Sequence, residues 1–199
     1  MANPVTSDQV IDVAARLLAE LSYDGTSLQL IADAVGVSSA QLTEMTGGKR
    51  DLYLAVMQRA FQAEQAMLRN VLETAESGRA AVHRLADDYL DFYLQNPKIR
   101  ALWTHRWVSD AADVADLEDR YSRPLLRQAA QRIDGAVPGD VDTYYLLGTL
   151  VWCVHGFLGS GVLAPDQGMI PPDDPGAVRS FRAHLHLLMD RLLTPPQAG

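Results

Sequence analysis

The segment between Thr26 and Lys49 is rich in side chains that can make directional hydrogen bonds. Hydroxyl groups there can donate to phosphate oxygens. A glutamine can read adenine, and a glutamate can accept a hydrogen bond from the cytosine amine in the major groove. The chemistry open to this segment is therefore recognition of a nucleic acid. The candidate contact residues are Thr26, Ser27, Ser38, Ser39, Gln41, Thr43, Glu44 and Lys49.

Local signals place these residues on short helices and in the turns between them. Ser27 and Ser38 are typical N-caps, and Gly36 is a typical helix end. Capping also explains the two serines without any ligand. Apolar residues recur with the helical period and predict helices over residues 7–22, 28–35 and 39–45. Three short helices joined by such tight turns predict a helix-turn-helix module.

The rest of the chain predicts a larger helical region with no strand. Pro124 should kink or split one helix. Asp140 is expected to cap another, and the segment 164–175 reads as a proline-rich loop. The expected helices span residues 49–76, 79–95, 98–109, 113–134, 141–163 and 175–193. The predicted fold is therefore all-α, with a DNA-binding domain at residues 1–48 and a second helical domain at residues 49–199.

The first 60 residues resemble the TetR family of bacterial transcriptional regulators. The stretch VIDVAARLLAELSYDGTSLQLIADAVGVSSAQL is similar to the first three helices of that family, and GGKRDLYLAVMQRA to the start of the fourth. Beyond residue 60 the resemblance is only architectural. It implies a homodimer that binds double-stranded DNA at a palindromic operator. It also implies a larger domain that dimerises and binds a small-molecule effector.

The third helix departs from the family pattern. Thr43 replaces the tyrosine that contacts phosphate, and Thr46 replaces a packing phenylalanine, whereas Leu42 and Lys49 are kept. Residues 1–60 hold four Lys or Arg against seven Asp or Glu, so their net charge of −3 weakens attraction to phosphate. Glu44 is read either as a base contact or as a solvated surface residue. Two hypotheses therefore stand: a repressor released from its operator by an effector, or a dimeric ligand-binding or protein-interaction module whose helix-turn-helix no longer binds DNA.

The predicted helix at 141–163 is apolar nearly all round, so it should be buried on more than one side. We expect this helix and the last one to form a four-helix dimer interface with their copies. The alternative is that both belong only to the core of the monomer. The predicted interface residues are Gly148, Trp152, Gly156, Gly159, Phe181, Leu185 and Leu188.

Aromatic and polar residues on the middle helices are candidates for an effector site. A histidine among apolar residues needs a hydrogen-bond partner, which either the protein or a ligand can supply. Aromatic residues at this spacing also suit an ordinary core. An aromatic lining favours an apolar or aromatic effector. The candidate residues are Tyr89, Phe92, Tyr93, Trp103, Trp107, Tyr144 and His155.

Other classes of protein find little support in the sequence. It has no Gly-x-Ser-x-Gly, phosphate-binding glycine loop or His-Glu-x-x-His motif, so an enzyme is not expected. Cys153 is the single cysteine, which excludes an internal disulfide and a cysteine-based metal site. We expect no cofactor and no metal. The sequence shows no signal peptide and no apolar segment long enough for a membrane, so a cytoplasmic location is expected.

Overall fold

The computed structural model describes residues 5–73, 76–166 and 168–194. The chain divides into two compact units, which are described separately. The first unit is Met1–Ala63 with Asn96–Tyr121, and the second is Glu64–Gln95 with Ser122–Gly199. The predicted DNA-binding domain lies within the first unit, and its boundary at residue 48 stays a prediction.

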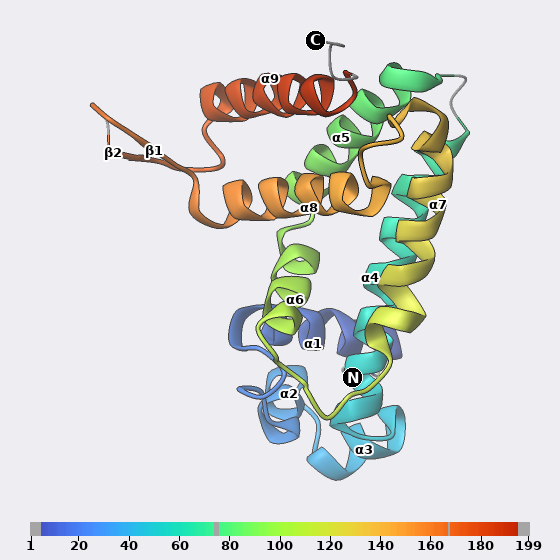
Figure 1. Cartoon of the computed structure of the whole chain (residues 1–199). Helices are drawn as coiled ribbons and strands as arrows, with labels where there is room; N and C mark the ends of the chain where they lie inside the picture. Colours follow the sequence, from blue (N-terminus) through green and yellow to red (C-terminus); the bar gives the residue numbers. More distant parts are fainter. Residues whose placement is uncertain (1–4, 74–75, 167, 195–199) are drawn as a thin grey trace. The chain divides into compact units, whose positions relative to one another are not determined.

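The first unit is built on short capped helices (Figure 1). Its elements are α1 (Ser7–Leu21), α2 (Leu28–Val35), α3 (Ser39–Thr46), the first part of α4 (Lys49–Leu72) and α6 (Pro97–Trp107). Thr6 and Gln9 form a reciprocal capping box at the start of α1. The Ser27 hydroxyl accepts from the amide of Leu30 at the start of α2. The predicted first three helices and their caps are therefore confirmed.

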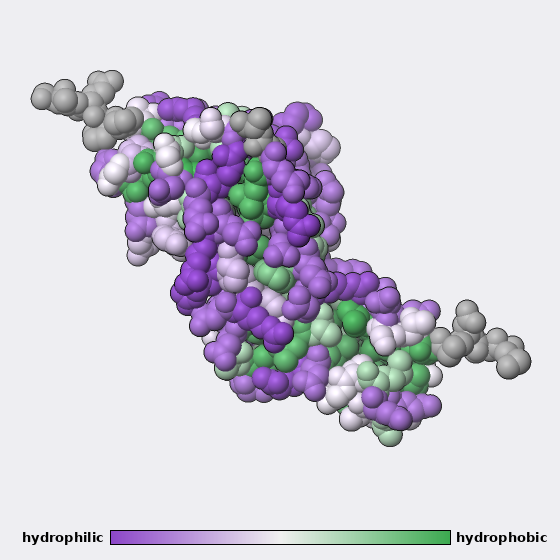
Figure 2. Space-filling model, turned by 90° about the vertical axis from the view of Figure 1, so that its right-hand side faces the viewer, coloured by the Kyte–Doolittle hydropathy of each residue, from purple (hydrophilic) through white to green (hydrophobic). Residues whose placement is uncertain are grey.

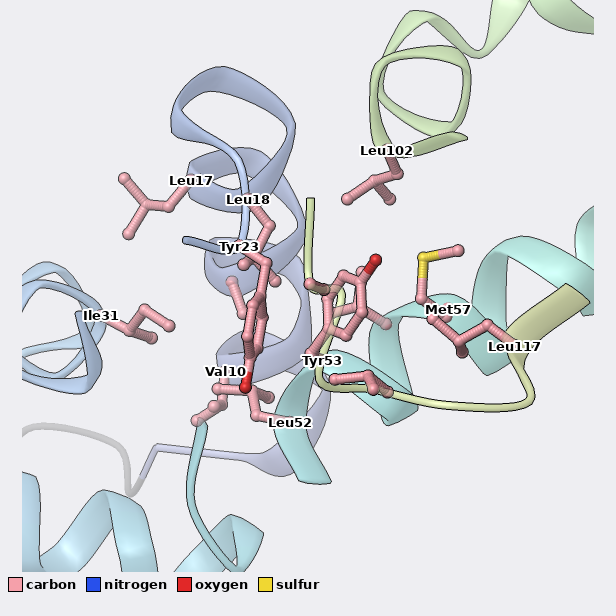
Figure 3. Packing of buried hydrophobic residues seen from close by; sticks show 14 of the residues in the cluster. Val10, Leu17, Leu18, Tyr23, Ile31, Leu52, Tyr53, Met57, Leu102 and Leu117 are labelled. Carbon is pink, nitrogen blue, oxygen red and sulfur yellow. The ribbon is translucent and has the colours of Figure 1, made fainter. Parts of the chain in front are cut away.

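The core of the first unit joins α1, α2, α3, α4 and α6 around one apolar cluster. Figure 3 shows Tyr23 and Tyr53 close together in this cluster, and their ring centroids are 4.7 Å apart. About 50 residues alone bury a marginal apolar core. Leu102 from α6 and Leu117 from the segment after it add to the core of the helix-turn-helix.

The segment that follows α6 is fixed by charged side chains. The Asp110 carboxylate accepts from the backbone amides of Tyr23 at 2.7 Å and Asp24 at 2.8 Å. Arg106 donates through Nε to Glu118 at 2.7 Å and through another nitrogen to the carbonyl oxygen of Ala111. The predicted helix over 113–134 is accordingly shorter. It consists of a π-helical turn, Glu118–Ser122, followed by α7 (Arg123–Ile133).

The change from the π-helical turn to α7 lies just before Pro124. Pro124 occupies the first turn of α7, where its missing amide costs no helical hydrogen bond. Pro124 was predicted to kink or split the helix, but the π-helical turn runs directly into α7 at Arg123, so the chain stays helical at the proline and only the type of helix changes just before it. The expectation of regular helix from residue 113 is wrong.

In its described residues, the second unit consists of helices, their connecting loops and one hairpin. It contains the rest of α4, then α5 (Gly78–Gln95), α7, a 3-10 turn (Asp134–Ala136), α8 (Thr143–Ser160) and α9 (Pro175–Leu192). Helix α5 packs against α7, α8 and α9, and α8 also packs against α7 and α9. The predicted end of α4 at residue 76 is wrong, since α4 ends at Leu72, and residues 74 and 75 lie outside the described part.

The cap of α8 differs from the sequence-based expectation. Asp142, not Asp140, caps this helix, because the Asp142 carboxylate accepts from the backbone amides of Tyr144 and Tyr145. The helix therefore begins two residues later than predicted, at Thr143.

The predicted proline-rich loop contains a two-stranded antiparallel hairpin, β1 (Val162–Ala164) and β2 (Gly168–Ile170). Gly161 precedes it at φ 70°, where a Cβ atom would overlap the carbonyl oxygen of Ile170. Figure 1 shows the hairpin extending away from α8 and α9. The expectation of a chain without strands is therefore wrong at this one place.

A ladder of charged side chains joins α5 to α9. Asp190 accepts from Arg79 at 2.6 Å and pairs with His83 at 2.9 Å. Asp87 pairs with His186 at 2.9 Å and with Arg182. The rings of the two histidines stack with centroids 4.2 Å apart. These residues recur every fourth position on both helices, so the ladder fixes the register of α9 along α5.

The surface is mostly hydrophilic on the face drawn in Figure 2, with smaller hydrophobic areas between the polar side chains. Across the described ranges, no helix combines the length and the apolar character needed to span a membrane.

Candidate nucleic-acid interface and effector site

The helices α2 and α3 are joined by a tight turn. Gly36 adopts a left-handed conformation at φ 85°, which favours glycine, and its amide bonds back to the last turn of α2. Ser38 then caps α3 through the amide of Gln41. Leu42 is completely buried and attaches α3 to the core of the first unit. The neighbouring residues Thr43 and Glu44 are therefore left exposed on the outer face of α3.

Most of the hydroxyl groups that were predicted to contact phosphate form hydrogen bonds within the protein. Thr26 is only 1% exposed, and its hydroxyl donates to the carbonyl of Ser22 at 2.6 Å. It cannot reach a phosphate, so this predicted contact is wrong. Ser27 remains at the surface as the N-cap of α2, where its oxygen accepts from the amide of Leu30.

The hydroxyls on α3 donate to neighbouring acceptors. Ser38 donates to the side-chain oxygen of Gln41 at 3.1 Å, and Ser39 donates to that of Gln29 at 2.5 Å. Thr43 donates to the carbonyl of Ser39 at 2.8 Å. Each of these hydroxyls has one proton, which is already used. In this arrangement their oxygens are left to accept, and their predicted role as donors to phosphate stays a prediction.

Lys49 lies at the start of α4 and was predicted to contact phosphate. Its ammonium nitrogen lies 4.1 Å from the centroid of the Tyr23 ring. A cation over an aromatic face is attracted by the negative face of the ring. This contact holds the ammonium group close to the protein, and the contact of Lys49 with phosphate stays a prediction.

Four of the predicted effector residues come together in the second unit. Tyr93 lies beside His155, with ring centroids 4.5 Å apart, and also contacts Tyr89 and Phe92. The Tyr89 hydroxyl lies 3.2 Å from Nε2 of His155. The Tyr93 hydroxyl donates to the carboxylate of Glu64 at 2.5 Å. We call Glu64, Tyr89, Phe92, Tyr93 and His155 the polar cluster.

Three residues of the polar cluster are buried, and Tyr89 and Phe92 are half-buried. Glu64 is 4% exposed, and His155 is also buried. Burial raises the pKa of Tyr89 and of Tyr93 above the usual value, so both phenols stay protonated and able to donate. The buried carboxylate of Glu64 was missed in the sequence. Its signal was its place four residues after Ala60 and four before Leu68, both buried on the same helix.

The other predicted effector residues lie elsewhere. Trp103 is buried in the core of the first unit, and Trp107 is an exposed residue on the same helix, α6. Tyr144 is exposed in the first turn of α8. It lines an open surface pocket with Ala130, Gln131, Asp134, Asp142 and Thr143. The structure therefore does not bring these three residues into the polar cluster.

The predicted dimer residues divide between surface and core. Trp152 is 62% exposed on α8, and Gly156 and Gly159 are exposed on the same helix. The indole of Trp152 folds back over Gly148, where an added Cβ atom would lie 3.4 Å from the ring.

The residues predicted on α9 lie deeper. Leu185 is completely buried in the monomer, so it cannot offer surface to a second copy and its predicted place in the interface is wrong. Phe181 is half-buried and stacks on Phe157 with centroids 4.1 Å apart, and Leu188 is also half-buried.

The first helices match a known family. Residues 10–56 match the model described as bacterial regulatory proteins, tetR family. These residues therefore carry the DNA-binding region of the tetR family. The match runs from α1 into α4 and therefore covers the turn between α2 and α3. The resemblance predicted from the sequence is confirmed.

Individual relatives of this chain are distant. An uncharacterized HTH-type transcriptional regulator of Bacillus subtilis (strain 168), YezE, is 23% identical over 130 residues, which are 65% of this chain and 66% of YezE. The crystal structure of PfmR, a TetR family transcriptional regulator from Thermus thermophilus, has a TM-score of 0.64 at 22% identity, over 99% of this chain and 100% of PfmR. AibR, solved with isovaleryl coenzyme A and operator DNA, has a TM-score of 0.67 at 17% identity, over 95% of this chain and 98% of AibR. At these identities the structural similarities concern the fold.

Proposed function

We propose that this TetR-family protein is a dimeric transcriptional regulator that acts as a repressor. It binds a palindromic operator through α3 and leaves it when a small molecule binds. The observation that carries the proposal is the arrangement of α2 and α3: both helices keep their serine caps, Gly36 makes the turn, and Leu42 seats α3 with its outer face exposed. This is the geometry in which a second helix can enter a major groove.

Dimerisation is needed because one module binds weakly. When one module of a dimer binds its half-site, the second module is held close to the other half-site at a high effective concentration. This raises the affinity of the dimer for the operator by roughly 10²–10⁴. The exposed Trp152 on α8 supports a dimer surface there, because tryptophan is enriched at protein–protein interfaces. The recognition helices must then lie about one DNA turn apart, roughly 34–36 Å, or a multiple of it.

The polar cluster is the proposed effector site. It offers aromatic faces together with a buried carboxylate and two phenol groups that stay protonated. Such a site suits an apolar or aromatic effector with a polar group that can replace one of the internal hydrogen bonds. AibR was solved with a coenzyme A thioester, which supports the expectation that proteins of this fold take small-molecule ligands.

The second candidate is a ligand-binding or protein-interaction module that does not bind DNA by itself. Two observations favour it: the net charge of −3 in residues 1–60, and the hydroxyls of Ser38, Ser39 and Thr43, whose protons are used within the protein. Both lower the attraction of α3 for phosphate.

Selection of DNA fragments from the source genome separates these functions. The full-length protein is incubated with fragments at low salt and at near-physiological salt, and the retained fragments are sequenced. A repressor is expected to recover a palindromic site that survives the higher salt. Lys49→Ala should weaken binding to all sequences alike, because a phosphate contact carries no sequence information. Binding that vanishes with salt, or none, contradicts the DNA-binding function of the apo-protein and favours the second candidate.

A further inference from the structure

Most polar groups on the outer face of α3 can accept a hydrogen bond from a ligand but cannot donate one. The Ser38, Ser39 and Thr43 hydroxyls donate within the protein, so their oxygens can only accept. Thr46 likewise donates to the carbonyl of Leu42 at 2.8 Å. Glu44 is exposed, and no hydrogen bond or ion pair joins it to another residue within the described ranges. A carboxylate accepts and never donates.

Gln41 is the exception on this face, and its orientation is fixed. The backbone amide of Ser38 donates to the side-chain oxygen of Gln41 at 3.0 Å. A backbone N–H can only donate, so the side-chain amide must turn its oxygen inward and its NH₂ group outward. A bidentate contact with adenine needs both groups. The adenine contact predicted for Gln41 is therefore not available while the capping box of α3 is intact.

We propose that α3 reads a guanine with Gln41 and a cytosine with Glu44, and that Glu44 determines the base preference of this protein. The inference rests on the proposed DNA-binding function. Guanine presents two neighbouring acceptors, N7 and O6, to the outward NH₂ group of Gln41. Cytosine presents an amine donor to Glu44. Adenine also has an amine, but its N7 acceptor lies beside it and repels a carboxylate, and thymine and guanine offer acceptors.

The spacing of the two residues places the two bases close together. Three residues of α-helix rise about 4.5 Å, and one base step is about 3.4 Å. Gln41 and Glu44 therefore read the same G·C pair or two adjacent pairs. The carboxylate of Glu44 also repels the phosphates of any DNA sequence. It therefore lowers the affinity for all DNA, while its contact with cytosine supplies the base preference.

The test is selection of random DNA duplexes with the full-length protein, followed by binding titrations of Glu44→Gln and Gln41→Ala. The wild type should enrich a half-site with G and C within one base step. Exchange of that cytosine for another base should weaken binding of the wild type by about 10- to 100-fold. Glu44→Gln should bind unrelated DNA more tightly and lose the preference for cytosine. A free glutamine at this position should favour adenine, because it can offer both groups.

Glu20→Gln is the matched control, since it removes one exposed carboxylate from α1 of the same unit without touching α3. It should leave base preference unchanged. If Glu44→Gln raises affinity for all sequences and keeps the wild-type preference, Glu44 is a solvated surface residue and the inference is wrong. An enriched half-site that has no guanine and cytosine in the same base pair or in adjacent pairs also overturns it. Absence of any enriched site instead contradicts the proposed function itself.

Discussion

Asp110 links two distant segments of the first unit through its carboxylate. It is 8% exposed, and its two carboxylate oxygens accept from the amides of Tyr23 and Asp24 at 2.7 and 2.8 Å. These amides lie in the turn between α1 and α2, 86 and 87 residues earlier in the chain. Asp110→Ala leaves the buried amide of Tyr23 without a partner and exposes that of Asp24 to water.

The magnitude follows from the two bonds. A hydrogen bond to a charged group contributes about 1.5–3 kcal/mol when it is buried. The bond to Tyr23 is buried and the bond to Asp24 is only partly so, which gives a loss of about 3–4 kcal/mol for Asp110→Ala. Asp110→Asn keeps one oxygen, which can turn to the buried amide. We expect it to lose about half as much.

Urea unfolding followed by tryptophan fluorescence measures this loss. In a Trp152→Phe background the two remaining tryptophans, Trp103 and Trp107, both lie in the first unit, so the signal reports that unit. Asp113→Ala is the matched control, because Asp113 is an exposed aspartate of the same segment. It should change the free energy of unfolding by less than about 0.5 kcal/mol. A loss for Asp110→Ala below about 1 kcal/mol, or equal to the control, would refute the reasoning.

Two further predictions concern pH and assembly. The hydrogen bond from Arg106 holds the pKa of Glu118 below its usual value of 4.5, so the pair stabilises the protein above that pH and this contribution is lost as the pH falls through the lower, folded pKa. Because the Glu118 side chain is half exposed, the difference in unfolding free energy between wild type and Glu118→Gln should stay below about 1 kcal/mol at neutral pH. This difference should vanish in acid, and a difference that grows as the pH falls contradicts the expected pH dependence. Trp152→Ala should weaken the dimer by at least about tenfold in sedimentation equilibrium, as expected for loss of an aromatic anchor, whereas the similarly exposed Leu163→Ala on the hairpin serves as a control; an unchanged dimer would place the interface elsewhere.

Local signals in the sequence predicted the elements that carry the proposed function. The caps at Ser27 and Ser38 depend on residues within three positions, so their spacing alone identifies them. The same holds for Pro124, because its ring and missing amide disfavour the interior of a regular helix. These features need no tertiary contact, and the structure places each of them where it was expected.

The errors concern features that depend on distant residues. Thr26 has the same chemistry as Ser27, and only the packing of the turn shows that one is buried and the other lies at the surface. Glu64 and Asp110 are charged residues whose partners lie 29 and 86 or more residues away. The hairpin was missed because each strand has only three residues, too few for an alternating pattern to stand out.

The charge of the first unit bears on how an effector could release this protein from DNA. With few cations near α3, nonspecific attraction to phosphate contributes little, and base contacts must supply a larger share of the binding free energy. Each half-site is then weak, and tight binding depends on both half-sites being held at the correct separation. Displacement of one recognition helix removes the gain from effective concentration, which is roughly 10²–10⁴ in affinity. On the proposed function, an effector therefore needs to change only the separation of the two helices, and a difference in its affinity for the two states of about 3–5 kcal/mol is enough. An acidic DNA-binding module, which argues against strong binding by one copy, is in this way compatible with a dimer that a small molecule can release.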